Sequence, residues 1–203
     1  MYSVLPSFVL GFHGCDASIA EKVFAGSVPL EPSENEYDWL GHGIYFWENS
    51  PERALEWAKE REKIREPAVV GAIIDLRYCF NLLDAKWLNA LPDAYESIRE
   101  LTEAAGEPMV KNSRLDAGGR TLLRPLDCLV INHLHKSRYD EGLRPFDSVR
   151  SAFVEDEPVY EGSGIDRKNH IQIAVRNPHC IKGYFRPLKP PELPEELEGW
   201  EDR

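Results

Sequence analysis

Polar and aromatic side chains that could bind a ligand lie beside predicted strands in three segments. These segments are Gly-Phe-His-Gly at 11–14, Leu-Gly-His-Gly-Ile-Tyr-Phe at 40–46 and Asn-His-Ile-Gln-Ile at 169–173. Imidazole and carboxamide groups both donate and accept hydrogen bonds. His170 and Gln172 are two residues apart, so in a strand both side chains point to one face. The pattern indicates a polar site assembled at strand ends.

The sequence lacks the patterns of other common sites. No Gly-x-Gly-x-x-Gly follows the first predicted strand, and no Gly-x-x-x-x-Gly-Lys-Ser/Thr occurs, so both common phosphate-binding loops are absent. His133 and His135 have no third ligand nearby at metal spacing. The four cysteines are far apart and form no Cys-x-x-Cys pair, which argues against a zinc site and a disulfide scaffold. We therefore expect no metal.

Strands interspersed with helices must position these segments. Short apolar runs predict strands at 8–12, 43–47, 68–76, 171–175 and 181–185. Capping and periodicity predict helices at 17–24, 51–65 and 85–105, the last interrupted near Pro92. Residues 126–135 fit a helix or a strand, and we favour a helix. Residues 26–39 read as a long loop, and 106–124 and 155–168 as irregular. The pattern predicts a mixed α+β domain.

Composition bounds the class of protein. The chain has 203 residues and a net charge of −11, which disfavours nonspecific nucleic-acid binding. No apolar stretch approaches the ~18–20 residues that span a bilayer. No basic segment followed by an apolar run opens the chain, so we expect a cytoplasmic protein without membrane contact. We predict one domain over residues 1–188 and an acidic Pro/Glu-rich tail over 189–203.

The segment WLGHGIYFWENSPERALEWA at 39–58 resembles the nicotinamide site of the ADP-ribosyltransferases related to diphtheria toxin and the poly-ADP-ribose polymerases. In that family a His-Gly strand end precedes a Gly-x-Gly-Ile-Tyr-Phe strand and a Ser-capped helix. Here His13 and Tyr45 lie 32 residues apart. The likeness covers residues 8–58 and, more loosely, 159–186. It implies split mixed β-sheets with flanking helices around an NAD cleft, in which His13 and Tyr45 meet.

The resemblance also implies roles for single residues. His13 would bind the adenosine-side ribose of NAD, and the backbone of Gly14 would hold the nicotinamide amide. Tyr45 would stack on the nicotinamide ring, a cation–π contact worth about 0.5–2 kcal/mol. Trp57 is a second stacking candidate, displaced by one position. Arg53 stands where the family has a small serine.

The catalytic glutamate of that family has no counterpart here. Gln172 or His170 occupies its place, and we favour Gln172. A neutral amide can bind the ribose 2′-hydroxyl, but it cannot oppose developing positive charge as a carboxylate does. Glu161 is our candidate for the missing carboxylate, as acceptor-activating base or charge stabiliser. Arg120, Arg124 and Arg150 are alternative ligands for the pyrophosphate.

The expected activity is cleavage of the nicotinamide–ribose bond of NAD and transfer of ADP-ribose to a protein or nucleic acid. The acidic charge favours a protein acceptor. With water as acceptor, the protein would be an NAD glycohydrolase. The missing glutamate leaves open a non-catalytic module that binds NAD or ADP-ribose. Small domains of this kind resemble bacterial toxins or phage-defence effectors that a separate immunity protein neutralises.

Overall fold

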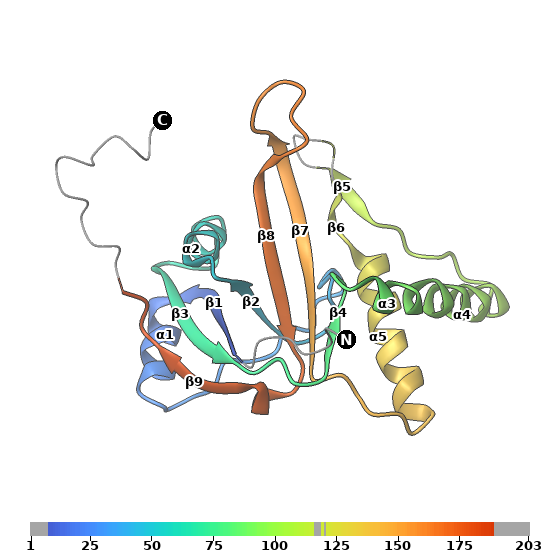
Figure 1. The fold of residues 1–203 in the computed structure, drawn as a ribbon, viewed down its shortest axis with the longest axis horizontal. Helices are drawn as coiled ribbons and strands as arrows, with labels where there is room; N and C mark the ends of the chain where they lie inside the picture. Colours follow the sequence, from blue (N-terminus) through green and yellow to red (C-terminus); the bar gives the residue numbers. More distant parts are fainter. Residues whose placement is uncertain (1–7, 116–118, 120, 189–203) are drawn as a thin grey trace.

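A computed structural model describes residues 8–115, 119 and 121–188. Seven strands form one mixed sheet in the order β4-β7-β8-β2-β1-β3-β9, with only the β4–β7 pair parallel (Figure 1). The strands are β1 (Val9–Asp16), β2 (Ile44–Glu48), β3 (Pro67–Ile74), β4 (Cys79–Asn81), β7 (Ser148–Pro158), β8 (Asp166–Val175) and β9 (Ile181–Phe185). A separate hairpin joins β5 (Ser113–Leu115) to β6 (Thr121–Leu123). The predicted tail at 189–203 lies outside the described residues.

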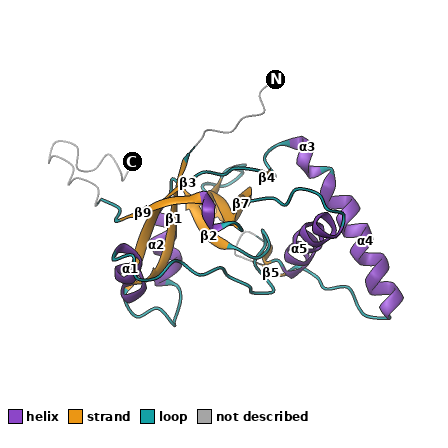
Figure 2. Ribbon diagram, turned by 90° about the horizontal axis from the view of Figure 1, so that it is seen from below, coloured by secondary structure: helices purple, strands orange, loops and turns teal. Residues whose placement is uncertain are grey.

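Helices flank this sheet in two groups (Figure 2). The first group, α1 (Ala17–Phe24) and α2 (Pro51–Lys59), packs beside β1 and β3. The second group lies at the β4–β7 end and comprises α3 (Ala85–Leu88), α4 (Ala90–Ala105) and α5 (Pro125–Asp140). A short 3₁₀ turn, η1 (Pro178–Cys180), precedes β9. The prediction of a mixed α+β domain is confirmed.

The sheet is continuous, and the prediction of split sheets is wrong in this respect. The join is narrow, however, because within the described residues β1 pairs with β2 at two positions, Gly11–Glu48 and Phe12–Trp47, with one further backbone bond from Asn49 N to Leu10 O at 3.0 Å. On its other edge β1 pairs with β3 along its whole length, Val9 to Asp16. We call the two-residue join the β1–β2 seam. It connects a β1-β3-β9 half of the sheet to a β2-β8-β7-β4 half.

Strand alternation sends side chains of β2 and β8 into separate cores. Phe46 and Ile173 are fully buried in the core beneath α1. Tyr45 and Ala174 face the other way, into the core that α4 and α5 cover. A third, smaller cluster joins Phe12, Trp47 and Ala54 beside the seam.

Local capping chemistry explains where α1 begins and why α2 is short. The Asp16 carboxylate accepts from the backbone N–H of Ser18 at 3.0 Å, which confirms the predicted N-cap. The same carboxylate accepts from the backbone N–H groups of Arg65 and Glu66 at 3.0 and 3.2 Å. These bonds hold the chain in the extended path that enters β3. They place Arg65 and Glu66 outside the helix, and the helix predicted over 51–65 is shorter than expected, ending at Lys59.

Long-range pairing produced strands that local patterns did not predict. Residues 155–158 extend β7 and 166–168 begin β8, because Glu155 pairs with Lys168 across the hairpin. The segment 106–124, predicted irregular, contains β5 and β6. The helix favoured for 126–135 is confirmed and runs over the whole of α5.

Candidate functional site

His13 and Tyr45 are adjacent where β1 and β2 separate beyond the seam. His13 Nδ1 lies 2.8 Å from the carbonyl oxygen of Tyr45. A carbonyl only accepts, so Nδ1 carries the proton of the neutral imidazole and Nε2 is left as an acceptor. Desolvation by burial lowers the His13 pKa, and the neutral form is favoured. The main chain of one predicted site residue thus orients the side chain of the other.

The two rings nevertheless have different neighbours. The His13 imidazole lies 5.8 Å from the ring of Phe46, whose side chain points to the opposite sheet face from that of Tyr45. The Tyr45 hydroxyl donates to Gly41 O and accepts from Leu40 N, each at 2.9 Å. Burial raises the pKa of Tyr45 well above its usual value. A neutral phenol is therefore locked against the 40–41 loop.

Gly14 is required by the packing of α2. A Cβ at this position would lie 2.2 Å from the carbonyl oxygen of Ala54, which is backbone and cannot move aside alone. The same added Cβ would lie only 3.2 Å from the Cβ of Ala58, one turn further along α2. The close approach of β1 and α2 therefore explains this glycine without a ligand.

The sheet face that carries Trp47 brings together both late-chain candidates. Trp47 is paired with Gln172 across β2 and β8. Its ring lies 5.6 Å from Trp57 and 6.2 Å from His170. Phe153 of β7 stacks at a tilt on the other side of His170, at 5.4 Å. We call this group the Trp47 cluster.

Hydrogen bonds define the polar groups of this cluster. Gln172 Oε1 accepts from Trp39 Nε1 at 2.7 Å, and Gln172 Nε2 lies 3.0 Å from His170 Nε2. The indole only donates, so the amide oxygen must face it and the amide nitrogen must face the imidazole. His170 Nε2 is then the acceptor. The proton of the neutral ring sits on Nδ1.

Three buried N–H donors in this region have no partner among the described residues. They are Trp47 Nε1, Arg53 Nε and His170 Nδ1. Burial, followed by the charges of Arg53 and Lys168, lowers the pKa of His170 to about 3. A buried unsatisfied donor costs roughly 1–3 kcal/mol. Donors grouped in this way suit a ligand rich in acceptor oxygens.

A carboxylate is present in the cluster, although it is not the predicted one. Glu155 forms an ion pair with Arg53, which also pairs with Glu56. Glu155 follows Phe153 by two residues on β7, so both point to the face of His170. Period-2 alternation with Phe153 could have identified it, had the strand been predicted.

The structure does not bring Glu161 to Gln172. Glu161 is exposed in the turn that joins β7 to β8, the loop that projects at the top of Figure 1. Gln172 is six residues from Asp166, where β8 begins. At about 3.3 Å per residue, those six residues alone span roughly 20 Å. Glu161 lies beyond them.

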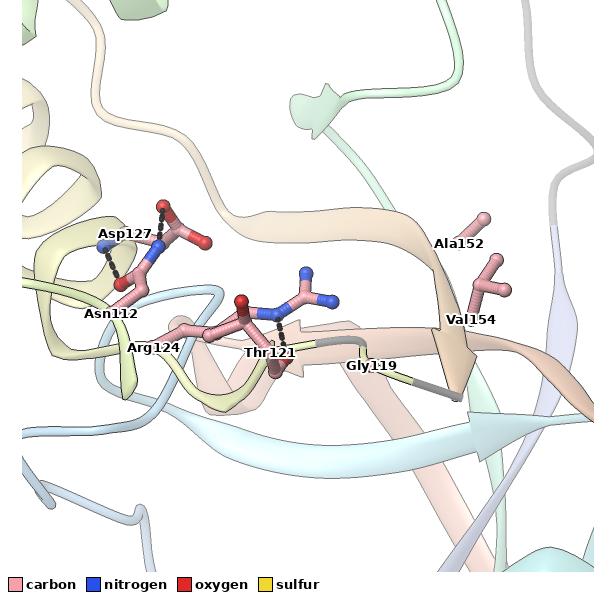
Figure 3. A pocket seen from close by; sticks show the side chains of 7 residues that line it. All are labelled: Asn112, Gly119, Thr121, Arg124, Asp127, Ala152 and Val154. Carbon is pink, nitrogen blue, oxygen red and sulfur yellow. Dashed lines mark hydrogen bonds between the residues drawn. The ribbon is translucent and has the colours of Figure 1, made fainter. Parts of the chain in front are cut away.

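A cavity of about 460 Å³ runs along the free edge of β7 (Figure 3). Arg124 lines it, with its guanidinium carbon 4.3 Å from the ring centre of Phe153 and 4.9 Å from that of Trp39. Arg124 Nε donates to Thr121 O at 2.9 Å. The other lining residues are Asn112, Gly119, Thr121, Asp127, Ala152 and Val154. Through Trp39, this cavity adjoins the Gln172 amide.

The other predicted pyrophosphate ligands are placed differently. Arg150 forms a two-pronged ion pair with Glu48, at 2.6 and 2.8 Å, on the sheet face opposite Gln172. This pairing raises the pKa of Arg150. Arg120 lies outside the described residues. Of the two candidate arginines that the structure describes, Arg124 is the one that adjoins the Trp47 cluster, through Phe153.

The described part of the chain holds no group of three or more metal-ligating side chains. Within the same residues, no helix is both long and apolar enough to cross a bilayer. All four cysteines are buried free thiols.

Comparison with known proteins gives one distant similarity. No protein-family model matches the chain. An uncharacterized protein of Methanocaldococcus jannaschii is 28% identical over 195 residues, a match that covers 84% of this chain and 83% of the archaeal protein. The similarity thus extends over nearly the whole of both chains and assigns no activity.

Proposed function

We propose that this protein is an NAD-dependent ADP-ribosyltransferase of the branch related to diphtheria toxin and the poly-ADP-ribose polymerases. The observation that carries the proposal is the bond from His13 Nδ1 to the Tyr45 carbonyl at the β1–β2 seam. The two motifs that resemble the family therefore meet at one point of the fold. The narrow seam supports an NAD cleft at this point, between the two halves of the sheet.

In this proposal, His13 Nε2 accepts a hydrogen bond from a ribose hydroxyl of NAD, because its Nδ1 proton is already donated. The resemblance assigns the nicotinamide amide to the backbone of Gly14 and the nicotinamide ring to Tyr45. Because the His13 and Tyr45 rings lie on opposite faces of the sheet, NAD would have to pass between β1 and β2 beyond the seam to contact both. Trp47 Nε1 and Arg53 Nε supply donors for ribose and phosphate oxygens. Trp57 closes the aromatic wall against Trp47.

The reaction breaks the bond between nicotinamide N1 and ribose C1′, and the electron pair leaves with neutral nicotinamide. An acceptor on a macromolecule, either a protein or a nucleic acid, forms the new bond to C1′ and gives up its proton. Gln172 holds the ribose 2′-hydroxyl through its amide. Glu155, ion-paired with Arg53, supplies negative charge on the same sheet face. Glu161, at the hairpin tip, lies too far from Gln172 to activate the acceptor atom that attacks C1′.

The Gln172–Trp39 bond also supports the rival function, a module that binds NAD or ADP-ribose without turnover. Both Gln172 amide groups are already engaged within the protein. A neutral, internally satisfied residue at the position of a catalytic acid is what a binding module would have. A role as a toxin or phage-defence effector with a cognate immunity protein is compatible with either function.

One experiment separates these functions. The purified protein is incubated with NAD labelled in the adenylate part, with and without cell lysate, and nicotinamide release is followed by chromatography. Label retained on macromolecules supports transfer, and protease or nuclease treatment then identifies the acceptor class. Free ADP-ribose alone supports hydrolysis. NAD binding by calorimetry without nicotinamide release supports the binding module, and absence of NAD binding rejects all three.

His13→Ala is the informative variant, because it removes the imidazole and leaves the seam pairs at Gly11 and Phe12 in place. We expect NAD affinity to fall at least tenfold. His179→Ala is the matched control, since His179 is exposed on η1. Equal affinity in both variants contradicts the proposed site.

A further inference from the structure

A second cavity, of about 350 Å³, lies between α5 and the end of β8. Its volume falls within the range of about 300–1,000 Å³ that is usual for small-molecule sites. It has cationic and hydrogen-bonding walls and no carboxylate among its lining residues, which are His42, Asn132, His135, Lys136, Tyr139, Pro145 and Arg176. In a chain with a net charge of −11, this is a locally positive site.

Arg176 is the most informative residue of this cavity. Its guanidinium forms no ion pair with any described residue, and Nη1 donates only to the Phe146 carbonyl, at 3.2 Å. Burial lowers the pKa of Arg176. A desolvated charge without a counter-ion is costly, and the usual remedy is an opposite charge. The cavity beside it is where such a charge would fit.

His135 provides a second, independent observation. It is only 6% exposed, and neither ring nitrogen has a partner among the described residues. Phe80 and Phe146 pack edge-on against its ring, at 6.4 and 6.0 Å. Burial and the charges of Arg176 and Arg138 lower its pKa to about 3. A neutral imidazole therefore lines the cavity with an N–H that is free to donate.

Of the remaining lining residues, Lys136 and Tyr139 supply further donors. Lys136 forms an ion pair with Asp140 at 2.6 Å, one turn along α5, on the exposed side of the helix. Asn132 Oδ1 accepts from the backbone N–H of His42 at 3.0 Å, which fixes the rim of the cavity to α5. The exposed Tyr139 contributes a phenol.

We propose that this cavity binds the phosphate group of a small phosphorylated molecule. A guanidinium fork and an ammonium suit a phosphate dianion, and a buried imidazole N–H adds a charge-assisted bond. The site is separate from the Trp47 cluster and does not depend on the proposed NAD chemistry.

Binding of inorganic phosphate to the full chain tests this proposal. The midpoint of thermal unfolding is measured at pH 7.5 across a phosphate titration, with potassium chloride holding ionic strength constant. We expect a saturable rise for the wild type, because a ligand that binds only the native state stabilises it. For Arg176→Gln, half-saturation should need at least tenfold more phosphate. Arg167→Gln, which removes an exposed arginine paired with Glu157, should respond as the wild type does.

If Arg176→Gln does not fold, nuclear magnetic resonance of the ¹⁵N-histidine-labelled wild type tests phosphate binding independently. Phosphate should shift the ring signals of His135 and His42 saturably and leave that of the exposed His179 unchanged. For Lys136→Gln, a change on the exposed face of α5, half-saturation of these ring-signal shifts should need several-fold more phosphate. A wild type with no saturable response, or equal responses in wild type and Arg176→Gln, overturns the proposal.

Discussion

The indole N–H of Trp39 donates to the side-chain oxygen of Gln172 at 2.7 Å, across 133 residues of sequence. Because indole has no acceptor, this bond orients the amide, and the amide in turn orients the proton of His170. One loop residue therefore sets the hydrogen-bonding character of two residues on β8. The neutral histidine then carries its proton on Nδ1, which is one of the three unpartnered donors in this region.

Replacing Trp39 by phenylalanine should release this arrangement. A smaller aromatic ring remains, but the Gln172 amide loses the donor that fixes its orientation, and His170 loses its preference for the Nδ1 proton. We expect ¹⁵N shifts of His170 to move toward a tautomer mixture. The free energy of unfolding should fall by about 0.5–1.5 kcal/mol, the net value of one hydrogen bond. Trp57→Phe is the control, because no hydrogen bond joins Trp57 to Gln172 in the described part of the chain. This variant should leave the ¹⁵N shifts of His170 unchanged. An unchanged His170 signal in Trp39→Phe would contradict this account.

Gln172→Glu tests whether the neutral amide limits turnover. Under the proposed function, a carboxylate at this position opposes the positive charge that develops on the ribose, and charge of this kind is worth about 10²–10³ in rate elsewhere. We expect nicotinamide release to rise at least tenfold. Gln172→Ala, which removes the amide without adding charge, should lower it. Equal rates for the two variants would show that this position does not contact the reacting ribose.

Gly14→Ala should destabilise the fold whether or not NAD binds. Its Cβ would meet the Ala54 carbonyl at 2.2 Å, so β1 and α2 must separate. We expect a loss of about 1–3 kcal/mol in the free energy of unfolding by urea. Gly183→Ala on β9 is the control, because a Cβ there meets nothing within 4 Å and should change stability by less than about 0.5 kcal/mol. Similar losses for both variants would reject the packing argument.

Asp16 should make stability depend on acid pH. Hydrogen bonds from Ser18, Glu66 and Arg65 lower the pKa of Asp16 from 3.8 to about 2. The native pKa lies below the unfolded value, so the stabilisation is complete above about pH 4 and is lost as pH falls toward 2. Thermal unfolding midpoints of the wild type and Asp16→Asn should therefore differ at pH 5 and converge near pH 2. Glu62→Gln removes one exposed carboxylate as a control and should follow the wild type. A gap for Asp16→Asn that persists at pH 2 would point to a cause other than ionisation.

Local sequence signals predicted the elements whose ends are fixed by nearby residues. Asp16 caps α1, Pro51 opens α2, and α5 follows its apolar pattern. The C-terminal end of β7 was not predictable, because its charged residues are typical of a loop and form a strand only by pairing with β8, as Glu155 does with Lys168. The β5–β6 hairpin was missed for the same reason.

The sequence likewise predicted only part of the candidate site. The motifs predicted that His13 and Tyr45 are neighbours, and the His13 ring does reach the Tyr45 backbone. They did not predict that the two rings lie on opposite faces of the sheet. The carboxylate Glu155 and the proton position of His170 depend on contacts across strands, which have no local signature. The choice of Glu161 followed proximity in sequence, whereas a long hairpin carries that residue away from Gln172.

The β1–β2 seam has a consequence for how the molecule fluctuates. Among the described residues, two paired positions, Gly11–Glu48 and Phe12–Trp47, and a backbone bond from Asn49 N to Leu10 O join the halves of the sheet. Within the halves, β1 pairs with β3 over eight positions and β7 with β8 over nine. Cooperative opening units in proteins follow such boundaries. Amide protons of the seam should therefore exchange with solvent deuterium sooner than those in the middle of β3 or β8. Under the proposed function, NAD would enter along this same seam.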